Sequence, residues 1–139
     1  MTIMSFKTAI FSDKAPKAIG PYSPAVCIDG LVLFSGMLPV DPATGTLAGA
    51  DIAAQTKQSL DNICAILEEA ELTLDNVVKT TVFLADIKDF GAMNAVYGEY
   101  FQTPCPARSC FQVAALPMGA KVEIEVTCAR GTIPAKEEK

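Results

Sequence analysis

The strictest pattern in this sequence is the alternation of apolar and polar side chains across residues 121–129. Successive side chains of a β-strand point to opposite faces of a sheet, so this alternation predicts a strand with one apolar and one polar face. The apolar face carries Val122, Ile124, Val126 and Cys128, and the polar face carries Glu123, Glu125 and Thr127. Such a strand needs a second layer of structure that covers only one of its faces.

Residues 51–70 have the spacing of a helix that can form part of this layer. Asp51 is a suitable N-cap, because its side chain can accept a hydrogen bond from the first turn. The apolar side chains near helical spacing are Ile52, Leu60, Ile63, Leu67 and Ala70. The polar side chains expected to cover much of the other side are Gln58, Asp61, Asn62, Glu68 and Glu69. We therefore expect this helix to pack with one face on a sheet.

A second helix is predicted at about residues 86–101, with Asp86 as its cap. Its buried stripe is expected to contain Phe90, Met93, Tyr97 and Phe101. Asn94 falls within that stripe, four residues after Phe90 and three before Tyr97. A polar side chain on a buried face needs a hydrogen-bond partner, so Asn94 either binds a nearby loop backbone or lines a pocket.

Three further segments are predicted to form strands. Residues 25–36 indicate a hairpin around Asp29-Gly30, because this dipeptide favours a tight turn in which both central residues have positive φ. Residues 77–84 are rich in β-branched side chains. Residues 107–113 alternate, and the side chains that share one face are those of Arg108, Cys110 and Gln112.

The order of these elements is strands, helix, strand, helix and strands. It predicts an α+β fold, in which a mixed sheet carries two helices on one face. The chain has 139 residues, so we expect a single domain over residues 1–133 and a charged C-terminal tail over residues 134–139. Half of the residues are hydrophobic, which favours an oligomer, because surplus apolar side chains of a small domain often lie in subunit contacts.

Charge and residue types exclude several kinds of site. The formal net charge of −5 disfavours binding to the phosphate backbone of nucleic acids. The chain has no histidine, which excludes Ser-His and Cys-His nucleophiles, and its five irregularly spaced cysteines predict neither a disulfide framework nor a zinc site. Residues 1–7 lack the apolar stretch of a signal peptide, and no segment has the ~20 apolar residues of a membrane helix, so we expect a cytoplasmic protein.

The last two predicted strands carry the residues best suited to chemistry. If residues 107–113 and 121–129 form neighbouring strands, Arg108 and Cys110 lie near Glu123 or Glu125. A guanidinium can donate two parallel hydrogen bonds to a carboxylate ligand, and a nearby Glu can hold or activate a water. This arrangement suits the hydrolysis of a small carboxylate substrate. It also suits an ion pair with no catalytic role, and composition does not separate the two.

Several motifs follow one another in a collinear order along the chain. The short ones are residues 19–23, 34–36, 58–62, 78–83 and 93–97, and a longer one runs from Pro106 through Arg108 and Lys121 to Ile124. Together they resemble the signature segments of the RidA (YjgF/YER057c/UK114) family, over roughly residues 7–130. One position departs from the deaminase branch of that family, because Met37 stands where many members have Gln. A flexible apolar side chain there would change the polarity of the pocket or the choice of substrate.

The resemblance implies a chorismate-mutase-like fold and a homotrimer with a barrel-like core and sites between subunits. It implies hydrolysis of 2-iminopropanoate and 2-iminobutanoate to 2-oxo acids and ammonia, without a metal or a cofactor. By the same resemblance, Arg108 binds the substrate carboxylate, Glu123 positions the attacking water, and the backbone of Cys110 contacts the imino nitrogen. The residues that complete the pocket, some from the neighbouring subunit, are Tyr22, Ser35, Gly36 and Asn94.

Each of these roles has a structural alternative. Tyr22 could anchor its loop, Ser35 could satisfy a backbone group at a strand end, and Cys110 could be an inert packed thiol. Glu125 lies on the same predicted face as Glu123, and Glu123 is preferred because it occupies the Glu position of the family signature.

The function has alternatives as well. The same cleft could belong to a sensor that binds 2-oxo acids without turning them over, although such a binder gains little from the negative charge of Glu123. A ribonuclease or translation inhibitor is opposed by the acidic net charge and the lack of histidine. A chaperone-like surface leaves no pattern in the sequence that would test it.

Overall fold

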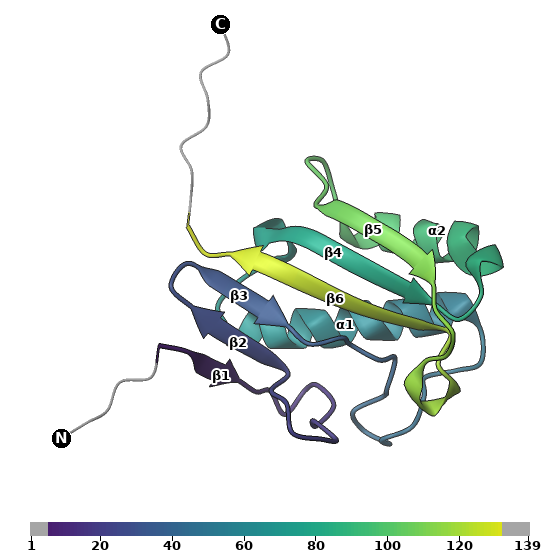
Figure 1. Ribbon diagram of the computed structural model, residues 1–139, viewed down its shortest axis with the longest axis horizontal. Helices are drawn as coiled ribbons and strands as arrows, with labels where there is room; N and C mark the ends of the chain where they lie inside the picture. The colour runs from purple at the N-terminus through teal and green to yellow at the C-terminus, as the bar shows by residue number, and fades with distance from the viewer. Residues whose placement is uncertain (1–5, 132–139) are drawn as a thin grey trace, which may run out of the picture.

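The computed structural model describes residues 6–131 and arranges six strands in one sheet, in the order β1-β2-β3-β6-β4-β5 (Figure 1). The strands are β1 (Thr8–Ile10), β2 (Ala25–Ile28), β3 (Leu31–Phe34), β4 (Val77–Leu84), β5 (Ala107–Gln112) and β6 (Val122–Ala129). The helices are α1 (Ile52–Glu69) and α2 (Phe90–Tyr100), with short 3-10 turns η1 (Leu74–Asn76), η2 (Ile87–Asp89) and η3 (Pro117–Gly119). The predicted tail at residues 134–139 lies outside the described residues.

The sheet is mixed, and both helices lie on one of its faces, as predicted (Figure 1). The β4–β5 pair is parallel, and every other neighbouring pair is antiparallel. A parallel pair needs a crossover connection, and here α2 provides it between β4 and β5. None of the helices among residues 6–131 is both long and apolar enough to cross a membrane.

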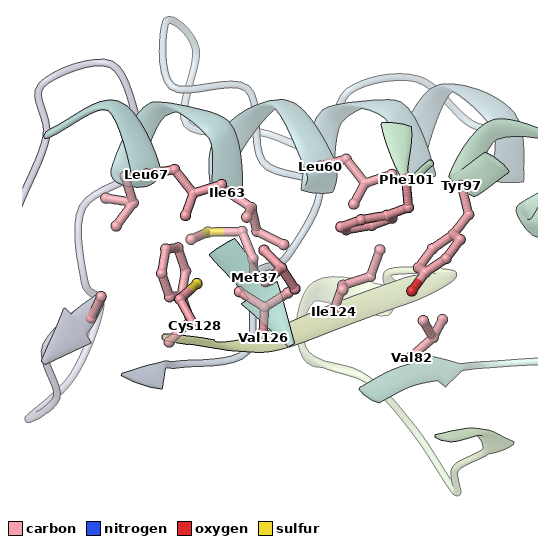
Figure 2. Close-up of a cluster of buried hydrophobic side chains, with 14 of the residues drawn as sticks. Met37, Leu60, Ile63, Leu67, Val82, Tyr97, Phe101, Ile124, Val126 and Cys128 are labelled. Carbon is pink, nitrogen blue, oxygen red and sulfur yellow. The ribbon is translucent and has the colours of Figure 1, made fainter. Parts of the chain in front are cut away.

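The alternation along β6 builds the core as predicted. Val122, Ile124 and Cys128 have no exposed surface and Val126 has 2%, whereas the side chains between them are half-buried. Figure 2 shows Leu60, Ile63 and Leu67 of α1 pointing toward this face of β6. Burial of each such aliphatic side chain contributes about 1.5–3 kcal/mol, so this interface is a main source of stability for the fold.

Helix α1 begins and ends close to its predicted limits. The Asp51 carboxylate accepts a hydrogen bond from the Ala54 amide at 2.7 Å, which confirms the predicted N-cap. The prediction that Asn62 covers the polar side of the helix is wrong, because Asn62 is 1% exposed. Its side-chain amide donates to the Leu38 carbonyl at 3.2 Å and the Val40 carbonyl at 2.9 Å. The loop after β3 thus bonds to a buried amide of α1.

The second helix is shorter than predicted. Asp86 caps the 3-10 turn η2 through the Lys88 amide at 2.9 Å, and α2 itself begins at Phe90. Met93, Tyr97 and Phe101 are buried as predicted, but Phe90 is 37% exposed and does not belong to the buried stripe. Phe90 lies in the first turn, where its ring is near a residue of the edge strand β5 instead of the core.

The expectation that residues 107–113 and 121–129 form neighbouring strands is wrong. β4 lies between them, with β5 paired to one edge and β6 to the other. The physical reason lies in the two connections. The crossover through α2 places β5 parallel to β4 at one edge of β4. The segment that contains η3 then leads the chain to the opposite edge of β4, where β6 pairs.

The hairpin at residues 25–36 is confirmed, with β2 and β3 joined by Asp29 and Gly30. Asp29 has a positive φ of 41°, but Gly30 is absent from the positive-φ glycines of the described residues. The prediction of positive φ at both central positions is therefore right for Asp29 and wrong for Gly30.

We predict that Asn62→Ala lowers the free energy of unfolding by about 1–3 kcal/mol, because two loop carbonyls lose their donor in a buried setting. Urea denaturation at fixed protein concentration measures the change. Glu69→Ala, an exposed change on the same helix, is the matched control and should alter stability by less than ~0.5 kcal/mol. Equal stability of both variants would show that the Asn62 hydrogen bonds are not needed.

Candidate functional site

Arg108 lies on β5, the edge strand, and its side chain is directed to the face that carries the helices. One guanidinium nitrogen, Nη1, donates to the Asn94 side-chain oxygen at 2.7 Å. The guanidinium carbon lies 4.7 Å from the centroid of the Tyr97 ring and 5.4 Å from that of Phe90. Asn94 therefore satisfies its polar side chain with Arg108 instead of a loop backbone.

Glu123 lies on the other face of the sheet, above the chain at Gly36. A Cβ added to Gly36 would lie 2.8 Å from the carboxyl carbon of Glu123, closer than side-chain atoms can approach. Glycine at position 36 is therefore what leaves room for this carboxylate. Burial, and to a lesser extent the negative charge of Glu125, raises the pKa of Glu123 above the usual value of a glutamate.

A cavity of about 530 Å³ lies between the loop before β2 and the loop after β3. The predicted site residues that line it are Tyr22, Ser35 and Gly36, together with Met37. The Tyr22 hydroxyl accepts a hydrogen bond from the Ile19 amide at 3.2 Å, and the Ser35 hydroxyl donates to the Ser23 carbonyl at 2.6 Å. Both side chains thus hold their loops, which is the structural alternative for each, while also facing the cavity.

The structure separates the predicted site residues into two groups within one chain. In the ladder, Arg108 lies beside Thr80 and Thr80 beside Val126, so these three side chains share the helix-covered face. Glu123 lies beside Phe83, and Phe83 beside Phe111, on the uncovered face. The expectation that Arg108 and Cys110 lie near Glu123 or Glu125 is therefore wrong for a single chain.

Cys110 belongs to the Arg108 group, two residues further along β5. Burial raises the pKa of the Cys110 thiol, and the positive charge of Arg108 offsets this only in part. The thiol is therefore held in its protonated form, without the depressed pKa of a nucleophilic cysteine. Within residues 6–131 no three side chains of the metal-ligating kinds gather in one place.

The uncovered face of the sheet is rich in apolar side chains. Leu31 and Leu33 on β3 are each 41% exposed, and Phe111 on β5 is 47% exposed. Phe111 packs edge-to-face on Phe83 with ring centroids 5.4 Å apart. The same face carries Glu123 and Glu125, so the acidic group and an exposed apolar surface lie together.

Sequence reasoning missed two residues that hold Arg108, namely Phe90 and Tyr97, because both were assigned only to a helix core. Their signal was the spacing of positions 90, 94 and 97, which places an aromatic, an amide and a second aromatic side chain on one helix face. It also missed Thr80, whose hydroxyl shares a buried hydrogen bond of 2.8 Å with the Tyr97 hydroxyl.

Comparisons with known proteins agree with one another. The family described as endoribonuclease L-PSP matches residues 12–130. The 2-iminobutanoate/2-iminopropanoate deaminase of Capra hircus is 51% identical over 124 residues, which cover 89% of this chain and 90% of that protein. The crystal structure of the YjgF gene product of E. coli is 45% identical, with a TM-score of 0.84, over 89% of this chain and 99% of the other. E. coli TdcF, solved with bound serine, is 42% identical, with a TM-score of 0.85 and the same coverage.

We predict that Glu125→Gln lowers the pKa of Glu123, because it removes the like charge that helps to raise it. A titration of the Glu123 carboxyl carbon by NMR measures the shift. Glu69→Gln, on the exposed side of α1, should leave that pKa unchanged. An unchanged pKa in Glu125→Gln would contradict the electrostatic coupling.

The same change has a consequence for stability. A carboxyl whose folded-state pKa is raised stabilises the fold below the pKa of the unfolded chain, about 4.3, and this contribution is lost as the pH rises through the folded-state value. Glu125→Gln should therefore increase stability at neutral pH, and the gain should disappear below about pH 4.

Proposed function

Since this chain belongs to the RidA (YjgF/UK114) family, whose family description is endoribonuclease L-PSP, we propose that it hydrolyses 2-imino acids such as 2-iminopropanoate and 2-iminobutanoate. The products are 2-oxo acids and ammonia. The single observation that carries the proposal is the guanidinium of Arg108, held in place by Asn94 and two aromatic rings. The 51% sequence identity to a protein named for this reaction supports the proposal.

Arg108 suits the carboxylate shared by all substrates of this class. The ion pairs Lys14–Glu68 and Lys57–Asp61 of the described residues do not use Arg108. A guanidinium has five N–H donors, and Asn94 accepts one of them. The remaining edge can donate two parallel hydrogen bonds to a carboxylate. TdcF, a similar structure, was solved with serine, which carries such a carboxylate.

Glu123 suits the activation of water. Its raised pKa makes it a better proton acceptor than an ordinary glutamate near neutral pH. In the proposed reaction, Glu123 takes a proton from water as the oxygen bonds to the imine carbon. Glu123 passes this proton to the nitrogen of the resulting carbinolamine. The carbon–nitrogen bond then breaks as the carbinol hydroxyl gives its own proton to Glu123, so that ammonia and the 2-oxo acid are released. A protonated imine is already electrophilic, so orientation and modest acid–base help suffice, without a cofactor of the protein's own.

A complete site needs two copies of the chain, because Arg108 and Glu123 lie on opposite faces of the sheet. We propose a homotrimer in which the uncovered sheet faces form a barrel-like core. In each cleft, one subunit supplies Arg108, Asn94 and the backbone of Cys110, and the next supplies Glu123 and the loops with Tyr22, Ser35 and Gly36. The exposed Leu31, Leu33 and Phe111 side chains supply the apolar area that such contacts bury.

A second candidate is a sensor that binds small carboxylates without turning them over, and the serine bound to TdcF favours it. The position of Glu123 opposes it, because a half-buried negative charge in the same cleft weakens the binding of a carboxylate. The description of the family as endoribonuclease raises a third candidate function, cleavage of RNA. The net charge of −5 and the absence of histidine oppose it.

We also propose that the whole of residues 1–133 forms one domain, and that the protein is cytoplasmic.

We predict that Arg108→Ala lowers imine deaminase activity at least about a hundredfold, because the substrate loses its charge-assisted anchor. In the assay, a serine or threonine dehydratase generates the 2-imino acid, semicarbazide traps it, and this protein competes with the trap. Less semicarbazone in the presence of the wild-type protein demonstrates hydrolysis.

Lys88→Ala, which removes an exposed positive charge on η2, is the matched control and should remain fully active. Wild-type activity in Arg108→Ala would refute the carboxylate clamp. No activity in a folded wild-type protein would favour the sensor, and titration with 2-oxo acids would follow.

A mixing experiment tests the division of the site between subunits. Alone, Glu123→Gln should lower turnover more than ligand affinity, and Arg108→Ala should be inactive. Equal amounts of the two variants, unfolded and refolded together, should form mixed trimers in about three quarters of cases, each with one intact site of three, so roughly a quarter of full activity should return. Recovery is expected only if Arg108 and Glu123 come from different subunits. Absence of recovery, with mixed trimers shown by mass spectrometry, would place both residues of a site in one subunit.

A further inference from the structure

We propose that Tyr97 is the positioning residue of Arg108 and that the Thr80 hydroxyl fixes Tyr97, so that the guanidinium is held in the orientation that receives a carboxylate. The inference rests on the proposed function for its effect on catalysis, but the arrangement itself concerns side chains within one chain. It assigns a role to two residues that would otherwise belong only to the core.

The guanidinium of Arg108 is surrounded by side chains from a single helix. Phe90, Asn94 and Tyr97 follow one another at intervals of four and three residues, which places them on one face of α2. Their distances to Arg108 are 5.4 Å and 4.7 Å for the two ring centroids and 2.7 Å for the Asn94 oxygen. A cation within about 6 Å of an aromatic ring centroid is attracted to its face. The rings thus limit rotation of the group, and Asn94 fixes one of its edges.

The ring of Tyr97 is fixed at both ends. Its hydroxyl shares a 2.8 Å hydrogen bond with Thr80, which has no exposed surface. Its ring packs against Phe101, with centroids 4.6 Å apart. Figure 2 shows the Tyr97 hydroxyl pointing from α2 toward the sheet near Val82. Tyr97 therefore connects the middle of β4 with the side chain of Arg108.

The ladder explains why Thr80 is suitably placed. Thr80 lies directly beside Arg108 in the parallel β4–β5 pair. The hydroxyl that holds the Tyr97 ring therefore comes from the residue next to the arginine that the ring supports. A buried hydroxyl pair is strongly coupled, because loss of one partner leaves the other unsatisfied, whereas loss of both can be nearly neutral.

Burial raises the pKa of Tyr97, although its bond to Thr80 and the charge of Arg108 act in the opposite direction. The phenol therefore stays protonated and neutral at working pH. Its interaction with Arg108 is that of a neutral ring with a cation, which leaves the positive charge of Arg108 available to a substrate carboxylate.

An arginine that is already oriented loses less conformational freedom when it binds a ligand. Removal of the ring should therefore weaken substrate binding and leave the chemical step almost unchanged. We expect Tyr97→Leu to raise KM about tenfold and to change kcat less than about twofold. Tyr97→Phe keeps the ring and should raise KM less than about threefold.

Tyr100→Phe is the matched control. Tyr100 lies on the same helix and donates to the Asp61 carboxylate at 2.6 Å, and no contact joins it to Arg108 among the interactions of the described residues. Tyr100→Phe likewise removes a hydrogen-bonded tyrosine hydroxyl of α2, so a general weakening of the helix would affect this variant too. We expect its KM to equal that of the wild type.

A pair of milder variants keeps the test decisive if Tyr97→Leu does not fold. Thr80→Val removes the hydrogen bond that fixes the Tyr97 ring and should raise KM. Adding Tyr97→Phe to Thr80→Val should raise KM little further, because both changes break the same bond. No rise in KM in Thr80→Val, or equal KM in Tyr97→Leu and Tyr100→Phe, would overturn the proposal. A fall in kcat at unchanged KM would also overturn it.

A measurement without substrate separates this inference from the proposed function. Side-chain ¹⁵N NMR of Arg108 should show slow rotation of the guanidinium in the wild type and in Tyr100→Phe, and fast rotation in Tyr97→Leu or, if that variant does not fold, faster rotation in Thr80→Val. If the wild type has no deaminase activity but shows this difference, the proposed function fails and the positioning of Arg108 stands. If rotation is the same in all variants, the positioning role is refuted whatever the activity.

Discussion

The structure depends on the pairing of β6 with β3 on one side and β4 on the other. Because side chains of a strand alternate, the register of this central strand decides which of its residues meet α1 and which face away. In the observed register, Val122, Ile124, Val126 and Cys128 are buried, and both glutamates are directed to the uncovered face. A slip of one residue would bury Glu123 and Glu125 in the core, at a cost that such a small domain could not offset.

The same strand order places the two halves of the candidate site apart. The registers of β5 and β6 on β4 put Arg108 and Glu123 on opposite faces, each in surroundings that suit a different task. Arg108 has its charge beside rings and an amide oxygen. Glu123 has a carboxyl whose pKa burial raises above the ordinary value. In the proposed trimer, the uncovered apolar sheet face beside Glu123 is the surface that would bring a second subunit to this half of the site.

Buried side chains that pack the core also shape this site. Tyr97 and Thr80 are both buried, and the fold would need residues of about their size in any case. Their shared hydrogen bond and the contact of the Tyr97 ring with Arg108 connect the packing of α2 on the sheet with the geometry of a charged group at its edge. Gly36 likewise shapes the site on the other face, because its missing Cβ leaves space for the Glu123 carboxyl.

The sequence by itself determined the features that depend on local periodicity and local chemistry. These include the two faces of β6, the limits of β4, the Asp51 cap of α1 and the α+β class, because alternation, helical spacing and capping involve residues close along the chain. It also identified Arg108, Glu123 and Asn94 as candidate residues, through motifs that belong to the family. Only the tertiary structure decided that β4 separates β5 from β6 and that the buried Asn62 amide donates to two loop carbonyls. It also decided that Asn94, Tyr97 and Phe90 surround Arg108. These features depend on pairings between residues far apart in the chain, which a local pattern leaves open because several strand orders bury the same apolar faces.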